Sequence, residues 1–215
     1  MDNTPLVLAQ LPALLDLAAI AAGALFGTAV AVARKAPLVG VMLLGVLMGL
    51  GGGMIRDALL DVPVEALHND MFLPVAVGVS LLGLPIARRI TEHPYVGLAL
   101  DGLSLGMFVM VGTEKAVILG YSASAAILIG LITAIGGGTI VDLLVGERPM
   151  VMRHGPWFAS AAVVGAALFV VLYPFIVTGL VEVLVVATVA SIRFTSERMG
   201  YAAPSVQTLR NIKRK

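Results

Sequence analysis

The 215-residue chain is 59% hydrophobic and only 13% charged, with a mean hydropathy of +1.02, which excludes an ordinary soluble domain. Its net charge of +1 favours neither a nucleic-acid partner nor an acidic substrate, and the absence of cysteine excludes disulfides and thiol chemistry. At about 20 residues for each membrane helix, this length predicts about seven spans and no extra domain.

Continuous apolar runs rich in Ala, Leu and Gly predict an all-α integral membrane protein, because membrane strands would alternate polar and apolar residues. Only Pro174 and a short turn separate the last two runs. A short outward N-terminus (1–10) is expected before the first run, which is interpreted as a retained span. In chain order, the predicted transmembrane helices are 11–33, 37–55, 71–87, 95–119, 122–145, 157–173 and 175–194.

The basic residues fall almost entirely on one side of such a seven-span topology. Arg56 and Lys115 lie within or at the edge of spans, and the other 12 of the 14 share one side: Arg34, Lys35, Arg88, Arg89, Arg148, Arg153, Arg193, Arg198, Arg210, Lys213, Arg214 and Lys215. By the positive-inside rule, the N-terminus faces outward and the C-terminus is cytoplasmic in the cell (inner) membrane. The basic tail (196–215) is expected to bind anionic lipid, each cation contributing about 1 kcal/mol.

An internal repeat appears when the sequence is shifted by 85 residues. Asp16 then aligns with Asp101, and the triple glycine at 51–53 aligns with that at 136–138. The predicted units are a first three-helix repeat (11–90), a second (95–174) and a C-terminal seventh helix (175–195). Three spans are an odd number, so the second copy must enter the membrane from the opposite face. This predicts inverted repeats, an architecture in which transport paths follow the repeat interface.

Both triple-glycine motifs fall inside predicted spans, at Gly51, Gly52 and Gly53 and at Gly136, Gly137 and Gly138. Three consecutive glycines cost about 1 kcal/mol each against alanine in a helix. We therefore predict that both helices kink or unwind here and expose carbonyl groups to a polar pathway. Close helix packing through small residues is the alternative.

Charged residues inside the spans are expected to face a cavity or a partner, since an isolated charge is costly in lipid. Asp16 and Asp101 lie near the starts of equivalent spans, and Asp57 and Asp142 near the ends of the spans that follow. Their alternative role is at helix ends, at headgroup level. Arg56 is placed to form a local ion pair with Asp57.

Lys115 follows Asp101 by 14 residues, about 21 Å along a helix. The hypothesis is that its ammonium caps the carbonyls of a broken glycine helix or guards the path as a gate. Snorkelling of the side chain to the outer interface is the alternative.

Taken together, these motifs resemble the prokaryotic trimeric intracellular cation (TRIC) channels, a family also catalogued as a glycine transporter domain. The residues that carry the resemblance are Asp16, GGGMIRDALL at 51–60, Asp101-Gly-Leu with Phe108, GTEKA at 112–116, and GGGTIVDLLVGERP at 136–149. The resemblance implies a homotrimer with a pore in each subunit, bounded by spans one, two, four and five, and a gating lysine matching Lys115. Val141 departs from the family, since bacterial members often carry a second arginine there.

The preferred function is a monovalent cation channel permeable to K⁺, with Na⁺ as a further permeant ion. Its hydrated path would be lined by carbonyls and by the hydroxyls of Thr133 and Thr139 instead of a dedicated filter. The alternative is a secondary transporter of a small zwitterion such as glycine. A scaffold without transport is the third possibility. The sequence carries no motif for an enzyme, and neither a cofactor nor a metal site is predicted.

Overall fold

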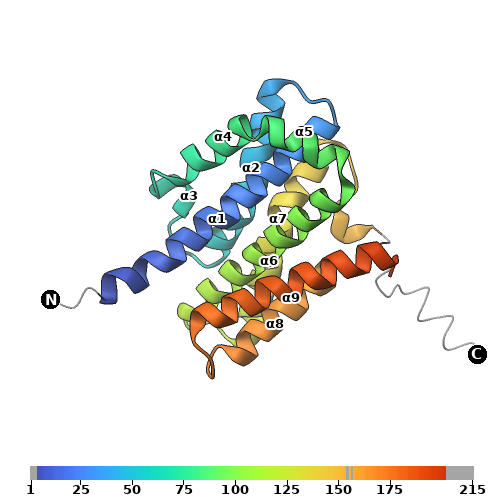
Figure 1. The fold of residues 1–215 in the computed structure, drawn as a ribbon. Helices are drawn as coiled ribbons and strands as arrows, with labels where there is room; N and C mark the ends of the chain where they lie inside the picture. The colour runs from blue at the N-terminus through green and yellow to red at the C-terminus, as the bar shows by residue number, and fades with distance from the viewer. Residues whose placement is uncertain (1–3, 154, 156, 202–215) are drawn as a thin grey trace, which may run out of the picture.

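A computed structural model describes residues 4–153, 155 and 157–201, and within them the secondary structure is entirely helical (Figure 1). The five long helices are α1 (Thr4–Ala33), α2 (Leu38–Leu59), α6 (Pro94–Ile118), α7 (Ala123–Leu144) and α9 (Thr178–Met199). The shorter elements are α3 (Glu65–His68), α4 (Phe72–Leu82), α5 (Leu84–Glu92), the 3₁₀ turn η1 (Met150–Met152) and α8 (Ala159–Leu172).

Among the described residues, five helices are long and apolar enough to cross a membrane, and α4 with α5 makes a sixth when the bent pair is counted as one span. The apolar helix α8 has 14 residues. It is about 21 Å long, shorter than the roughly 30 Å hydrocarbon layer. The prediction of a helical membrane protein is confirmed, whereas the regions predicted as single helices at 71–87 and 157–173 form a bent pair of helices and a helix of 14 residues.

The bend in the third predicted span has a local cause. The axes of α4 and α5 differ by 60° at Gly83, and Pro85 lies in the first turn of α5, where its missing N–H cannot continue the helix of α4. Ala87 and Ile90 of α5 are buried, whereas Arg88 is exposed. The α5 helix is therefore amphipathic and ends at Glu92, five residues beyond the predicted span.

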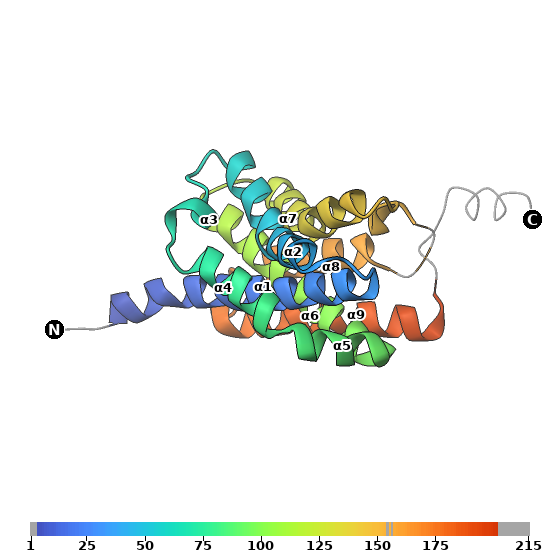
Figure 2. The same ribbon diagram turned by 90° about the horizontal axis from the view of Figure 1, so that it is seen from above.

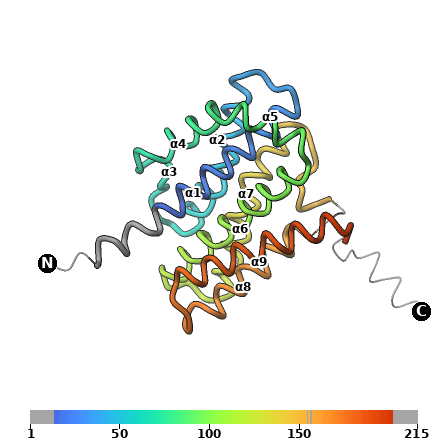
Figure 3. The backbone as a smooth tube through the Cα atoms, in the orientation of Figure 1, coloured from blue at the N-terminus to red at the C-terminus, as the bar shows by residue number. Residues whose placement is uncertain are grey.

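Helix α6 is the central element of the bundle. It contacts α1, α7, α8 and α9, and in the tube of Figure 3 it runs between α1 and α9. Within its spanning window 61% of the residues are buried, compared with 22% in α9. A residue on α6 can therefore contact helices of both predicted repeats.

Helices α2 and α7 pack against each other at their glycine motifs, and both are continuous through them. A Cβ atom added to Gly52 would overlap the carbonyl oxygen of Thr133, and one added to Gly137 would overlap that of Met48. The prediction that the two helices unwind at these motifs is wrong, whereas the predicted kink stays a prediction. The alternative of close packing is correct for this pair of glycines, because neither position has room for a side chain.

Equivalent hydrogen bonds recur 85 residues apart. The Oδ2 atom of Asp57 accepts from the backbone N–H of Glu65 at 3.0 Å, and Oδ2 of Asp142 accepts from that of Met150 at 2.8 Å. Each aspartate closes the loop that follows its long helix. The start of α1 and the end of α9 lie at opposite ends of the bundle (Figure 2).

The two ends of the chain differ from the sequence prediction. Helix α1 begins at Thr4, within the segment predicted as a short N-terminus (1–10), and α9 continues to Met199, inside the predicted tail (196–215). Residues 1–3 and 202–215 of these two predicted segments lie outside the described residues.

Candidate functional site

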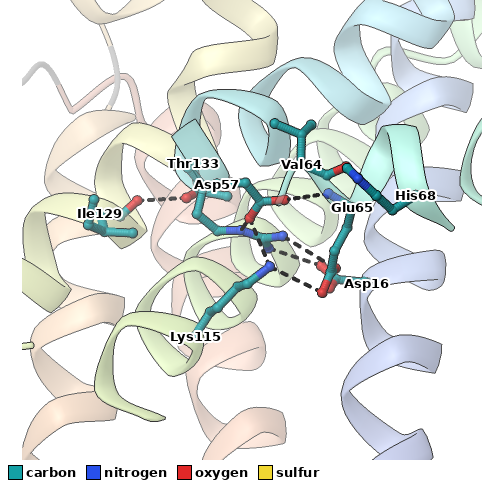
Figure 4. Close-up of polar contacts among 9 residues, drawn as sticks. Asp16, Asp57, Val64, Glu65, His68, Lys115, Ile129 and Thr133 are labelled. Carbon is teal, nitrogen blue, oxygen red and sulfur yellow. Dashed lines mark hydrogen bonds and ion pairs between the residues drawn. The ribbon is translucent and has the colours of Figure 1, made fainter. Parts of the chain in front are cut away.

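Five charged side chains from four helices meet at one end of α2, and we call them the Asp57 cluster. Asp16 comes from α1, Arg56 and Asp57 from α2, Glu65 from α3 and Lys115 from α6 (Figure 4). Three carboxylates face two cations, a formal excess of one negative charge when all are ionised.

Asp57 is the centre of this cluster and is only 1% exposed. Its Oδ1 accepts hydrogen bonds from Arg56 Nε and Lys115 Nζ, each at 2.8 Å. Arg56 is 2% exposed, and its Nη1 donates to Asp16 Oδ1 at 3.1 Å. The predicted ion pair between Arg56 and Asp57 is confirmed. Asp57 lies two residues before the end of α2 at Leu59, but it is buried among charged partners instead of being exposed to solvent.

Lys115 lies in the last turn of α6, three residues before its end at Ile118. Besides Asp57, its Nζ contacts Glu65 Oε1 at 3.2 Å, and the side chain is 20% exposed. The hypothesis that this ammonium caps backbone carbonyls is wrong. The ammonium instead binds the carboxylates of Asp57 and Glu65, and helices α2 and α7 are continuous through their glycine motifs. The distance along the helix from Asp101 does not give the depth of Lys115 in the membrane, because α6 ends three residues after Lys115.

A second group of charges lies toward the other end of α6, where Asp101 meets α9. Arg193 Nε donates to Asp101 Oδ2 at 2.8 Å, and its Nη1 donates to Glu197 at 2.7 Å. The guanidinium also lies 5.5 Å from the ring centroid of Phe158, a cation–π contact. Sequence reasoning missed Arg193 as the partner of Asp101. The i,i+4 spacing of Arg193 and Glu197 signals that local ion pair alone, not the contact with Asp101.

Asp142 is held differently from its counterpart Asp57. Val141 is fully buried at the position equivalent to Arg56, so α7 itself supplies no cation. Arg153 approaches instead from the following loop, with Nη2 3.6 Å from Asp142 Oδ1 and 2.6 Å from Glu147 Oε2. Arg34 at the end of α1 also pairs with Glu147. A loop arginine thus replaces the helix arginine that this chain lacks.

A cavity of about 120 Å³, which we call the central cavity, lies among α1, α2, α6 and α7. Its charged lining consists of Asp101, Asp142, Glu147, Arg34 and Arg153, again with one carboxylate in excess. Thr133 and Thr139 also line it, and their hydroxyls donate to Ile129 O at 2.7 Å and Ile135 O at 2.8 Å. Because these protons are committed to α7, the hydroxyl oxygens can only accept, which suits a cation.

A second cavity of about 10 Å³, the small cavity, lies beside the Asp57 cluster. That volume is at the lower limit for one water molecule. Its lining includes Asp16, Gly49, Gly53 and Arg56, and Phe108 lines both this cavity and the central one. Phe108 is therefore common to the linings of both cavities, and sequence reasoning did not single it out as a pathway residue.

The structure divides the predicted site residues into three groups. Asp101, Thr133, Gly138, Thr139 and Asp142 line the central cavity. Asp16, Gly53, Arg56 and Asp57 line the small cavity, and Lys115 contacts it through Asp57. The remaining predicted residues, Gly51, Gly52, Gly136 and Gly137, lie at the α2–α7 contact. In the described part of the chain, no three His, Asp or Glu side chains are grouped to hold a metal ion.

Comparison with known proteins adds independent information. A family model described as "Glycine transporter" matches the chain twice, at residues 13–88 and 98–174. The UPF0126 inner membrane protein YadS of Escherichia coli K12 is 34% identical over 161 residues, covering 74% of this chain and 77% of YadS. A UPF0126 membrane protein of Deinococcus radiodurans is 32% identical, covering 74% of this chain and 75% of that protein.

Solved structures with the same fold include ion channels. A TRIC trimeric intracellular cation channel orthologue from Rhodobacter sphaeroides matches with a TM-score of 0.81 and 30% identity, covering 88% of this chain and 98% of that chain. A prokaryotic TRIC channel crystallised in 0.5 M KCl also has a TM-score of 0.81, with 25% identity, covering 89% of this chain and 98% of that chain.

Proposed function

Because the chain belongs to the TRIC cation channel family, whose sequence model is described as "Glycine transporter", we propose that it is a monovalent cation channel permeable to K⁺, and to Na⁺ as a further ion. The observation that carries this proposal is the pair of cavities, whose linings both include residues of α1, α2 and α6. The central cavity is lined by carboxylates and threonine hydroxyls, and the small cavity is lined by carboxylates and by glycines of α2.

The pore of each subunit runs among α1, α2, α6 and α7, from the mouth beside Arg153 to the Asp57 cluster. The excess carboxylate at each end favours cations over anions, because a low-dielectric wall strengthens the local field. Selectivity among monovalent cations comes from a hydrated path with acceptor oxygens such as those of Thr133 and Thr139. The glycine motifs bring α2 and α7 close enough to form one wall.

The membrane architecture that fits this pore is two inverted three-helix repeats followed by α9. Two matches of one family model, 85 residues apart, support it, as do the equivalent hydrogen bonds of Asp57 and Asp142. The bent pair α4–α5 and the short α8 serve as the third crossing of each repeat. Because seven is an odd number of crossings, the two ends of the chain lie on opposite sides of the membrane. The N-terminus is outside and the C-terminus is cytoplasmic.

Single-cysteine labelling tests this orientation cleanly, since the chain contains no cysteine. In intact cells, an Asn3→Cys variant is expected to react with a membrane-impermeant maleimide. A Lys215→Cys variant is expected to react only after the membrane is opened. The reverse pattern would contradict the N-outside orientation.

The subunit is proposed to assemble as a homotrimer in the lipid bilayer, as the description of the Rhodobacter structure states for that protein. The basic segment 196–215 contacts anionic lipid at the cytoplasmic surface. Native mass spectrometry of the detergent-solubilised protein tests the stoichiometry: a mass of three chains supports the trimer, and a monomer or dimer contradicts it.

The function is tested with purified protein in liposomes loaded with KCl and diluted into a K⁺-free buffer. Rapid K⁺ efflux that protein-free liposomes lack supports the channel. Uptake of radiolabelled glycine without K⁺ efflux supports instead the glycine transporter that the family model's description suggests. The alternating-access step of a transporter limits its rate to one conformational cycle for each substrate.

Lys115 is proposed to control opening of this pore. Replacing it with alanine is expected to change the open probability about tenfold, because its ammonium is one of two cations that hold Asp57 at the outer end of the small cavity. Folding should change little, since Asp57 keeps Arg56 and the Glu65 N–H.

The matched control for this variant is Lys35→Ala, which removes an exposed lysine from the loop after α1. Single-channel recording of both variants measures the effect, with thermal unfolding as the check on stability. Open probability unchanged in Lys115→Ala would refute the role of this lysine in gating.

A further inference from the structure

Phe108 occupies an unusual place between the two cavities. It belongs to the central helix α6, is 7% exposed, and lines both the central and the small cavity. The polar path proposed above is therefore interrupted at one apolar ring.

The Phe108 ring packs against one position of α1, Gly23. A Cβ atom added to Gly23 would lie 2.8 Å from Phe108 Cε2 and 2.9 Å from Cζ, and 3.1 Å from the Cα of Gly49 on α2. The ring thus lies against bare backbone where α1 and α2 cross. Any side chain at Gly23 would push the ring out of this position.

Gly23 and Phe108 are also equivalent positions, because they are 85 residues apart. Where the two halves of the molecule face each other, there is room for a single ring. The chain places phenylalanine on one side and glycine on the other. Because only one of the two equivalent positions carries a side chain, the Phe108 ring alone can fill the space between them.

We propose that the Phe108 ring is a hydrophobic gate, which closes the pore when it rests on Gly23 and opens it when it turns away. This inference rests on the proposed channel function. On the outer side of the ring, the small cavity of about 10 Å³ cannot hold a hydrated ion, whereas the central cavity of about 120 Å³ has room for several waters. Hydrophobic constrictions of this kind stop conduction by excluding water.

The test is single-channel recording of Phe108→Ala in planar bilayers under KCl. Removal of the ring is expected to raise the open probability on the order of tenfold. Phe26→Ala is the matched comparison, because Phe26 lines the central cavity but not the small one, so its removal enlarges the path without removing the ring between the cavities; its open probability should rise much less than that of Phe108→Ala.

Two further variants keep the inference testable if Phe108→Ala does not fold. Phe108→Leu retains an apolar side chain without a ring and should raise the open probability less. Gly23→Ala should displace the ring and thereby also raise the open probability. In the Phe108→Leu background, where the ring is absent, the same substitution should raise the open probability less than it does in the wild type.

The outcomes separate this inference from the proposed function. A silent wild-type protein would contradict the channel itself. A conducting wild type whose open probability is unchanged in Phe108→Ala would overturn the gate while leaving the channel intact. Equal rises in Phe108→Ala and Phe26→Ala would also overturn it, because the effect would then follow cavity size instead of the ring position.

Discussion

Asp57→Ala is expected to lower the free energy of unfolding by about 3–5 kcal/mol, as breaking a buried ion pair from one side does. The substitution leaves the guanidinium of Arg56, 2% exposed, with Asp16 at 3.1 Å and Glu65 at 3.7 Å as its remaining carboxylates. It also removes the acceptor for the Glu65 N–H at the start of α3. Thermal and denaturant unfolding in mixed micelles measure the change.

The matched control is Asp142→Ala, the same change at the equivalent position of the other half. Asp142 is 17% exposed and its cation, Arg153, is 3.6 Å away, so the expected loss is about 1 kcal/mol. Equal losses in the two variants would show that the Asp57 cluster has no special role in stability. Net charge changes identically in both, so it cannot account for a difference between them.

Gly52→Ala is expected to destabilise the protein by about 1–3 kcal/mol or more, because overpacking at a backbone contact forces helices apart. The added Cβ would overlap the Thr133 carbonyl oxygen, which belongs to the α7 backbone and cannot turn away. Since α2 and α7 form one wall of the proposed pore, the same variant should reduce or abolish conduction. Unfolding in micelles and bilayer recording measure the two effects.

Gly53→Ala is the control one residue further along α2. Its Cβ would find only the Arg56 Nη2 atom, at 3.9 Å, so it has room. Alanine there should stabilise the helix by about 0.5–1 kcal/mol. If Gly52→Ala and Gly53→Ala instead had equal effects, the motif would act through backbone flexibility, as the sequence first indicated, and not through packing.

Much of the fold follows from residue pattern alone. Long apolar runs identify α1, α2, α6, α7 and α9, with ends that differ from the prediction by up to seven residues, because the membrane requires a length and an apolar composition that few other structures share. The charged residues at helix ends were also predictable as partners. Arg56 beside Asp57 is an example, since a buried charge in lipid must find an opposite one.

Other features depend on distances that a sequence does not contain. Three glycines in a row are compatible with a broken helix or with close packing, and only the position of Thr133 against Gly52 decides for packing. The partner of Asp101 could not be found either, because Arg193 is 92 residues away on α9. Phe108 looks like any apolar core residue until its contacts with two cavities are known.

The central claim is that this chain conducts monovalent cations. The most direct measurement is a planar-bilayer recording of the purified protein under a tenfold KCl gradient. Cation conduction predicts discrete unitary currents that reverse near the potassium potential, about 59 mV in magnitude, and that a mock preparation lacks. Silence at all voltages from protein that is folded and inserted would contradict the account, as would reversal at the chloride potential.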